Sequence, residues 1–172
     1  MNIVGVIPAR YASTRFPGKP LADIKGKTMI QRVYEQALKA ERLSDVIVAT
    51  DNELIFNTVN SFGGKVAMTS TEHRSGTDRC REVIEKLDGR YDAVVNIQGD
   101  EPFINPAQIN QLADIISMEG TDIASLCKPV KDERELFNPN AVKVVFDKNH
   151  KALYFSRNTM PYMRNVEKSE WL

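Results

Sequence analysis

The sequence predicts an α/β fold, with a mostly parallel sheet that is flanked by helices and carries a mixed or antiparallel extension. Up to Thr121, short apolar runs alternate with segments whose apolar residues recur at helical spacing. Such runs are typical of strands covered on both faces. Strand–helix–strand units of these lengths form right-handed crossovers in a parallel sheet. After Thr121, strand-like segments follow one another, which indicates antiparallel pairing.

Four apolar runs are the predicted strands of the parallel sheet: NIVGVIPA at 2–9, DVIVATD at 45–51, KVAMTS at 65–70 and AVVNIQ at 93–98. Four helices are predicted among them: TMIQRVYEQALKA at 28–40, NELIFNTVNSF at 52–62, GTDRCREVIEKL at 76–87 and AQINQLADII at 107–116. The second helix ends at Gly63-Gly64, where glycine can take the left-handed cap conformation. The fourth follows Asn105-Pro106, an N-cap residue and a proline at the first helical position.

Three strand-like segments follow, at 122–130, 141–147 and 152–157, and a turn joins the last two. No repeat, low-complexity tract or linker interrupts the chain, so we predict a single domain over residues 1–172. The polar segment 164–170 is followed only by Trp171-Leu172. We therefore expect the chain to be truncated at its C-terminus.

The composition excludes several functions. Lys and Arg number 23 and Asp and Glu number 23, so nothing indicates binding to nucleic acid or to an anionic membrane. The N-terminus lacks the pattern of a signal peptide, and no apolar run approaches the ~20 residues that span a bilayer. Cys80 and Cys127 lack metal-ligand spacing, which predicts two buried thiols in a reducing cytoplasm. Two histidines are too few for a histidine-built metal site.

The loop RYASTRFPGKP at 10–20 is cationic, contains no acid and follows the first strand. It lacks the first glycine and the final hydroxyl of a Walker loop, and it is not a G-x-G-x-x-G dinucleotide fingerprint. Ligands of open α/β sheets nevertheless bind at this edge. Backbone amides and polar side chains could neutralise a polyphosphate there: Arg10, Ser13, Thr14, Arg15 and Lys19. The alternative is a solvated loop with incidental charge.

Three further stretches are candidate sites. In NIQGDEP at 96–102, Asp100 and Glu101 could hold Mg²⁺ and Gln98 could contact a base, or the acids could simply favour the N-terminus of the next helix. In EHRSGTDR at 72–79, Ser75 or Thr77 could cap a helix, and Gly76 would allow close approach to a base or ribose. Arg157, at the end of a strand, is either a surface charge or a carboxylate-binding fork.

Several long motifs occur together in this chain: IPARYASTRFPGKPL, VIVATD, GGKVAMTSTEHRSGTDR, VVNIQGDEP, FNPNAVKVV and ALYFSR. In this order and spacing they resemble the 3-deoxy-manno-octulosonate cytidylyltransferases (CMP-Kdo synthetases) from residue 3 to about residue 161. The resemblance implies a Rossmann-like nucleotidyltransferase fold and transfer of CMP from CTP to 3-deoxy-manno-octulosonate (Kdo), with release of pyrophosphate. It also implies Mg²⁺ dependence, a cytoplasmic homodimer and a role in lipopolysaccharide synthesis.

The resemblance also implies roles for individual residues. Arg10 and Lys19 would bind the triphosphate, with Arg15 lending charge nearby. The nucleotide would contact Ser75, Gly76 and Gln98. Asp100 would hold Mg²⁺, and Arg157 would lie toward the sugar acid. Arg10, Lys19 and Asp100 would be the catalytic residues.

The family continues beyond the length of this chain, and its later part carries a second metal-binding aspartate, a histidine-containing sugar-site strand and much of the dimer surface. If the chain ends at Leu172, we expect weak or no turnover. Two alternatives are a cytidylyltransferase for another sugar acid, such as a sialic acid, and a CTP-binding module without turnover. The missing glycine fingerprint disfavours a dehydrogenase.

Overall fold

The computed structural model describes residues 1–12, 16–87 and 89–172. The chain divides into two compact units, Met1–Ser125 and Leu126–Leu172. The described part contains no helix that is long and apolar enough to cross a membrane.

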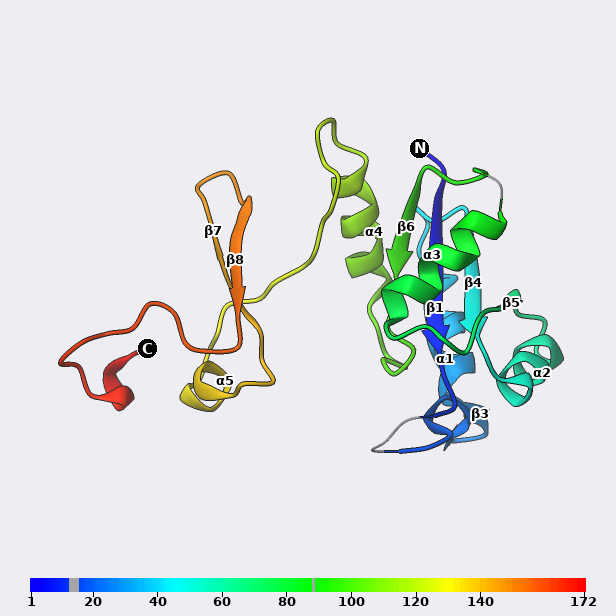
Figure 1. Ribbon diagram of the computed structural model, residues 1–172, viewed down its shortest axis with the longest axis horizontal. Coiled ribbons are helices and arrows are strands. Elements are labelled where there is room, and N and C mark those ends of the chain that lie inside the picture. The colour runs from blue at the N-terminus through cyan, green and yellow to red at the C-terminus, as the bar shows by residue number, and fades with distance from the viewer. Residues whose placement is uncertain (13–15, 88) are drawn as a thin grey trace. The chain divides into compact units, whose positions relative to one another are not determined.

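The first unit is built on a four-stranded parallel sheet (Figure 1). Its order is β5-β4-β1-β6, and its strands are β1 (Ile3–Ala9), β4 (Asp45–Thr50), β5 (Val66–Met68) and β6 (Ala93–Asn96). The chain first adds strands on one side of β1 and then returns to place β6 on the other side. The order of the strands therefore reverses between β1 and β6, which is where open α/β sheets bind ligands.

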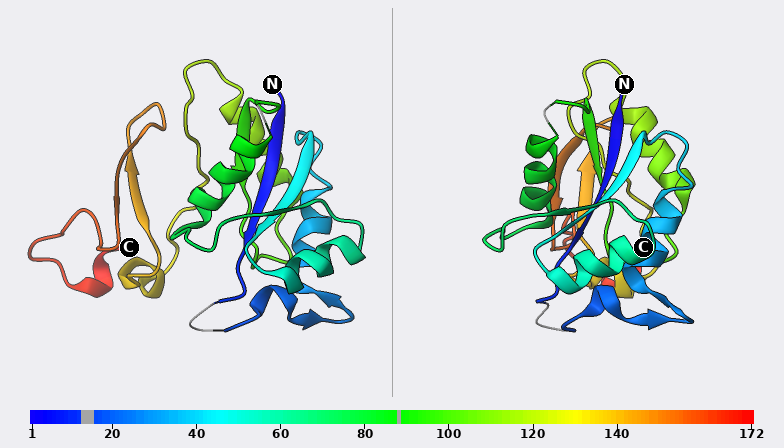
Figure 2. Two further views of the ribbon diagram at one scale, coloured as in Figure 1. Left: turned by 45° about the vertical axis from the view of Figure 1, so that its right-hand side comes forward. Right: turned by 90° about the vertical axis from the view of Figure 1, so that its right-hand side faces the viewer.

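Helices cover both faces of this sheet, as the buried strands require (Figure 2). One face packs against α1 (Met29–Ala37), α2 (Glu53–Ser61) and α4 (Pro106–Ile116) through residues such as Ile30, Ile55 and Ile109. The other face packs against α3 (Gly76–Lys86) through Cys80 and Val83. The alternating pattern of the sequence is thus confirmed as an α/β fold with a parallel sheet.

Local signals fix the helix ends where the sequence predicts them. The Asn105 side chain accepts a hydrogen bond from the amide of Ala107 and caps α4, with Pro106 in the first turn. Gly63, just after α2, has a φ of 77°, the left-handed conformation that favours glycine. Short elements lie between β1 and α1: the 3-10 helix η1 (Lys19–Leu21) and the strands β2 (Asp23–Ile24) and β3 (Lys27–Thr28), which pair antiparallel.

The second unit contains α5 (Glu133–Phe137), β7 (Lys143–Phe146), β8 (Ala152–Ser156) and the 3-10 helix η2 (Lys168–Glu170). The predicted antiparallel pairing of β7 and β8 is confirmed, but the two strands form a sheet of their own and do not extend the parallel one.

Two further predictions, both about residues 122–130, are wrong. Residues 122–130, all of them described, form no strand, and Pro129 within them cannot donate a ladder hydrogen bond. Cys127 in that segment is exposed, whereas Cys80 is buried under the sheet. Without a strand to cover it, the Cys127 side chain has no apolar layer in which to be buried.

Candidate functional site

The loops that follow β1 and β6 meet at the carboxyl edge of the sheet. The two strands are hydrogen-bonded neighbours, with Val6 opposite Asn96, and the amide of Ile97 donates to the carbonyl of Val6 at 2.9 Å. Arg10 follows the end of one strand and Gln98 follows the end of the other. The register of the sheet therefore brings together two residues that lie far apart in the sequence.

A pocket of about 210 Å³ lies at this edge. Four residues predicted from the sequence line it: Arg10, Ser75, Gly76 and Gln98. Five further residues, to which the sequence assigned no individual role, complete it: Pro8, Ala9, His73, Arg74 and Arg79. Most of its functional groups are cations or hydrogen-bond donors, so the pocket is suited to a polar ligand that carries negative charge.

The N-terminus of α3 forms one wall of this pocket. The Ser75 hydroxyl accepts the amide of Asp78 at 3.1 Å, and the amide of Ser75 donates to the Asp78 carboxylate at 3.2 Å, which completes a capping box. The hydrogen bond from Ser75 lowers the pKa of Asp78 below its usual value. Ser75 is therefore the N-cap residue, and its position at the positive end of the helix favours an anionic group in the pocket.

Two glycines allow the backbone segments around the pocket to approach closely. A Cβ atom on Gly76 would lie 3.1 Å from the Cγ of Pro8, and one on Gly99 would lie 2.9 Å from the carbonyl oxygen of Pro8. The second distance is shorter than real Cβ contacts, and the atom it meets belongs to the backbone. Glycine at these positions lets α3 and the loop after β6 both pack against the end of β1.

Lys19 and Asp100 form an ion pair across the same edge, with Nζ 2.5 Å from Oδ2. Lys19 begins η1, directly after Gly18, whose φ of 72° turns the chain and whose amide donates to the carbonyl of Tyr11 at 2.9 Å. The side chains of Lys19 and Asp100 are 36% and 51% exposed. Both groups are consequently accessible to a ligand in solution.

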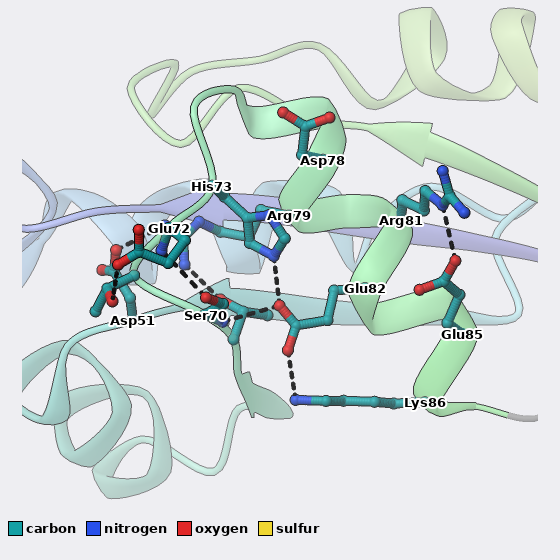
Figure 3. Close-up of polar contacts among 12 residues, drawn as sticks. Asp51, Ser70, Glu72, His73, Asp78, Arg79, Arg81, Glu82, Glu85 and Lys86 are labelled. Atoms are coloured by element: carbon teal, nitrogen blue, oxygen red, sulfur yellow. Dashed lines mark hydrogen bonds and ion pairs between the residues drawn. The ribbon is translucent and has the colours of Figure 1, made fainter.

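Arg79 is a buried cation that lines the pocket, and Figure 3 shows it with its partner Asp51. Its guanidinium donates to Asp51 at 2.6 Å and to the hydroxyl of Thr69, which lie just after β4 and β5. It thereby ties α3 to the ends of two strands. A charged residue on the inward face of a helix is the signal that could have revealed it, since such a residue is rarely buried without a partner.

The next residue, Cys80, is not a candidate nucleophile. Burial raises the pKa of its thiol to about 11, so the thiol stays protonated near neutral pH. Among the described residues, no group of three or more His, Cys, Asp or Glu side chains could hold a metal ion. Asp100 therefore belongs to no such cluster among the residues that the structure describes.

Two predicted site residues, Arg15 and Arg157, are not among the residues described above. Arg15, with Ser13 and Thr14, lies outside the described residues. Arg157 belongs to the second unit, where it is exposed and donates to the carbonyl of Pro139 at 2.9 Å. Its assignment to the sugar acid remains a prediction.

Comparison with known proteins identifies the family. A family model described as "Cytidylyltransferase" matches residues 4–169. The 3-deoxy-manno-octulosonate cytidylyltransferase of Parabacteroides distasonis is 56% identical over 100% of this chain and 69% of its own length. The chain belongs to the 3-deoxy-manno-octulosonate cytidylyltransferase family. The relative of the same name from Haemophilus influenzae is 53% identical over 96% of the chain and 65% of its own length.

Solved structures agree with this family assignment. A CMP:2-keto-3-deoxy-manno-octonic acid synthetase complexed with CTP superposes with a TM-score of 0.90 at 46% identity, over 96% of this cytidylyltransferase and 68% of that chain. A cytidylyltransferase from Leptospira borgpetersenii superposes with a TM-score of 0.61 at 22% identity, which shows the shared fold alone. The chain thus spans about 69% of the length of its first relatives.

Proposed function

We propose that this chain binds CTP at the carboxyl edge of its sheet and transfers CMP to 3-deoxy-manno-octulosonate, releasing pyrophosphate. The observation that carries the proposal is the pocket between β1, β6 and α3, which gathers Arg10, Ser75, Gly76 and Gln98. The names of the relatives and the CTP complex of the similar structure support the choice of nucleotide and sugar acid.

The residues of the pocket suit the parts of a nucleoside triphosphate. The Gln98 amide can both donate and accept, as an edge of cytosine requires. Arg10 and the N-terminus of α3 offer positive charge to phosphates. Lys19, on the following turn, supplies a second cation at the same edge. The protein then acts mainly by positioning the reactants and by stabilising the charge of the phosphates.

The reaction is a displacement at phosphorus. The anomeric hydroxyl oxygen of the sugar acid forms a bond to the α-phosphorus, and the bond from that phosphorus to the bridging oxygen breaks. Pyrophosphate takes the bonding electrons, and the hydroxyl proton passes to solvent. In this proposal, Arg10 and Lys19 stabilise the charge that develops on the leaving pyrophosphate.

Asp100 fits a Mg²⁺ site that the substrate completes. Its carboxylate is half exposed and follows Gln98 by two residues, and Mg²⁺ commonly binds one or two carboxylates together with substrate phosphates. When bound, the ion would neutralise phosphate charge and favour ionisation of the attacking hydroxyl. Lys19, which pairs with Asp100 in the free protein, would then be available to the phosphates.

The family resemblance supports three further parts of the proposal: a homodimer, a cytoplasmic location and a role in lipopolysaccharide synthesis. Measurement of the molar mass in solution by light scattering tests the first of them. A monomer at micromolar concentration would rule out the homodimer for this chain.

The direct test is pyrophosphate release from CTP and Mg²⁺ in the presence of Kdo, of N-acetylneuraminate or of no acid. Of these three conditions, we expect pyrophosphate release only in the one that contains Kdo. Release with N-acetylneuraminate would indicate the related sialic acid activity, and CTP binding without release would indicate a binding module. Arg10→Met should reduce release strongly, whereas Arg42→Met removes an exposed cation that pairs with Asp114 and should have little effect.

A further inference from the structure

The loop at 69–75 carries much of one wall of the pocket. It connects β5 to α3 and contributes His73, Arg74 and Ser75 to the lining. Its shape therefore determines where these three groups point. One backbone hydrogen bond holds the start of the loop, from the amide of Thr69 to the carbonyl of Thr50 at 2.8 Å, and the rest of its shape depends largely on side-chain contacts.

Three side chains of α3 hold this loop, and Figure 3 shows the contacts of one of them, Glu82. Arg79 donates to Thr69, Asp78 closes the capping box with Ser75, and Glu82 contacts the residues between them. Asp78, Arg79 and Glu82 lie on the first two turns of α3. The loop is thus fixed to the helix at its start, at its end and in its middle.

Glu82 makes the contacts in the middle of the loop. Its Oε2 accepts the amide of Ser70 at 2.8 Å and also contacts Nε2 of His73. Its other oxygen, Oε1, accepts from Lys86 at 2.7 Å, one turn further along α3. The side chain is only 20% exposed, so these contacts are partly shielded from water.

The charge of Glu82 is well stabilised in this position. Lys86, the amide of Ser70 and His73 together lower the pKa of its carboxyl group to about 2. The group is therefore an anion at neutral and mildly acidic pH. An anion accepts stronger hydrogen bonds than a neutral group does.

We propose that Glu82 is a positioning residue, which holds the loop at 69–75 in the shape that places His73 and Arg74 at the pocket. Glu82 does not line this pocket, and it acts through the residues that it holds. The identification of the ligand as CTP rests on the proposed function. The contacts between Glu82 and the loop do not depend on it.

The consequence is preorganisation. A ligand that contacts His73 or Arg74 binds more tightly when the loop is already in place, since less ordering accompanies binding. Loss of Glu82 should weaken the binding of CTP and raise its KM, while kcat at saturating CTP changes little. A residue that acts on the chemical step would lower kcat.

The test compares Glu82→Ala and Glu82→Gln with Glu85→Gln. Glu85 lies on the same helix and pairs with the exposed side chain of Arg81, so its variant makes the same change of charge without touching the loop. Glutamine at 82 retains the shape of the side chain, but its single oxygen cannot serve all three donors. It provides a folded variant should alanine destabilise the unit.

The first readout is hydrogen exchange of the backbone amides at 70–75 without nucleotide. Loss of a hydrogen bond to a charged group should speed the exchange of the Ser70 amide by about tenfold or more in Glu82→Ala. The second readout is calorimetric titration with CTP, in which Glu82→Ala should bind about tenfold more weakly and Glu85→Gln like the wild type.

Exchange and affinity at wild-type values in both Glu82 variants would overturn the proposal. Faster exchange with unchanged affinity would also overturn it, since the loop would then not matter to the pocket. If the wild-type chain does not bind CTP, the proposed function fails. The exchange measurement alone then decides whether Glu82 holds the loop.

Discussion

Replacement of Arg79 by methionine tests whether the buried pair with Asp51 holds the carboxyl edge of the sheet together. Methionine keeps much of the aliphatic volume and removes the charge. The Arg79 side chain is 4% exposed and that of Asp51 is 17% exposed. The variant therefore leaves the Asp51 carboxylate largely buried and without its cationic partner. Thr69 also loses its donor.

The expected loss follows from these exposures. Breaking a buried ion pair by removing one partner lowers stability by about 3–5 kcal/mol. Because Asp51 keeps some contact with water, we expect the lower end, about 3 kcal/mol. Domains have unfolding free energies of roughly 5–15 kcal/mol, so the variant should still fold.

Urea denaturation followed by circular dichroism at 222 nm measures this loss. The matched control is Arg81→Met on the same helix, whose pair with Glu85 is 79% and 59% exposed. A helical pair of this kind contributes about 0.3–0.5 kcal/mol. Equal, small losses in the two variants would refute the reasoning that Arg79 connects α3 to the strand ends.

Three further predictions concern the edge of the sheet and α3. Lys19→Ala should weaken CTP binding and leave the affinity for cytidine unchanged, because Lys19 is expected to contact the phosphates alone; calorimetry with both ligands measures this. Asp100→Ala should abolish Mg²⁺-dependent pyrophosphate release and the effect of Mg²⁺ on CTP affinity, yet keep the melting temperature, since its exposed pair contributes about 0–1 kcal/mol. Glu82→Gln should lower the unfolding free energy above pH 4.5, and its difference from the wild type should shrink as the pH falls toward 2.

The sign of the last prediction follows from the pKa of Glu82, which folding lowers from 4.5 to about 2. A carboxyl group with a lowered pKa stabilises the fold above its unfolded value, and this contribution is lost as the pH falls through the folded value. A difference between wild type and variant that grows on acidification would contradict it. For Lys19→Ala, the control is Lys39→Ala, which also removes an exposed cation. A loss of cytidine affinity as large as the loss of CTP affinity would refute the contact between Lys19 and the phosphates. Near-normal pyrophosphate release by Asp100→Ala would refute the role of Asp100 in holding Mg²⁺.

The elements of the first unit could be predicted because their signals are local. The apolar run 2–9 and the cap at Asn105 each determine structure within a few residues. The second unit was harder to predict. The apolar residues at 122–130 make that segment resemble a strand, but no neighbouring strand pairs with it among the described residues.

The pocket was predictable in part, for a topological reason. Parallel strands place the residues after their carboxyl ends at one edge, so Arg10 and Gln98 could both be expected there, and the pairing of β6 with β1 brings them together. The contacts of Arg79 and Glu82 carry no comparable signal. Arg79 pairs with Asp51, 28 residues earlier, and its need for a partner does not say which acid provides it. His73 meets Glu82 only because the loop folds back along α3.

The measurement that tests the central claim most directly is a calorimetric comparison of CTP with cytidine on the wild-type chain. If Arg10 and Lys19 bind the phosphates, CTP should bind at least about a hundredfold more tightly, since each charge-assisted contact contributes about 1.5–3 kcal/mol. Equal affinities for CTP and cytidine would contradict the assignment of this edge of the sheet as a triphosphate site.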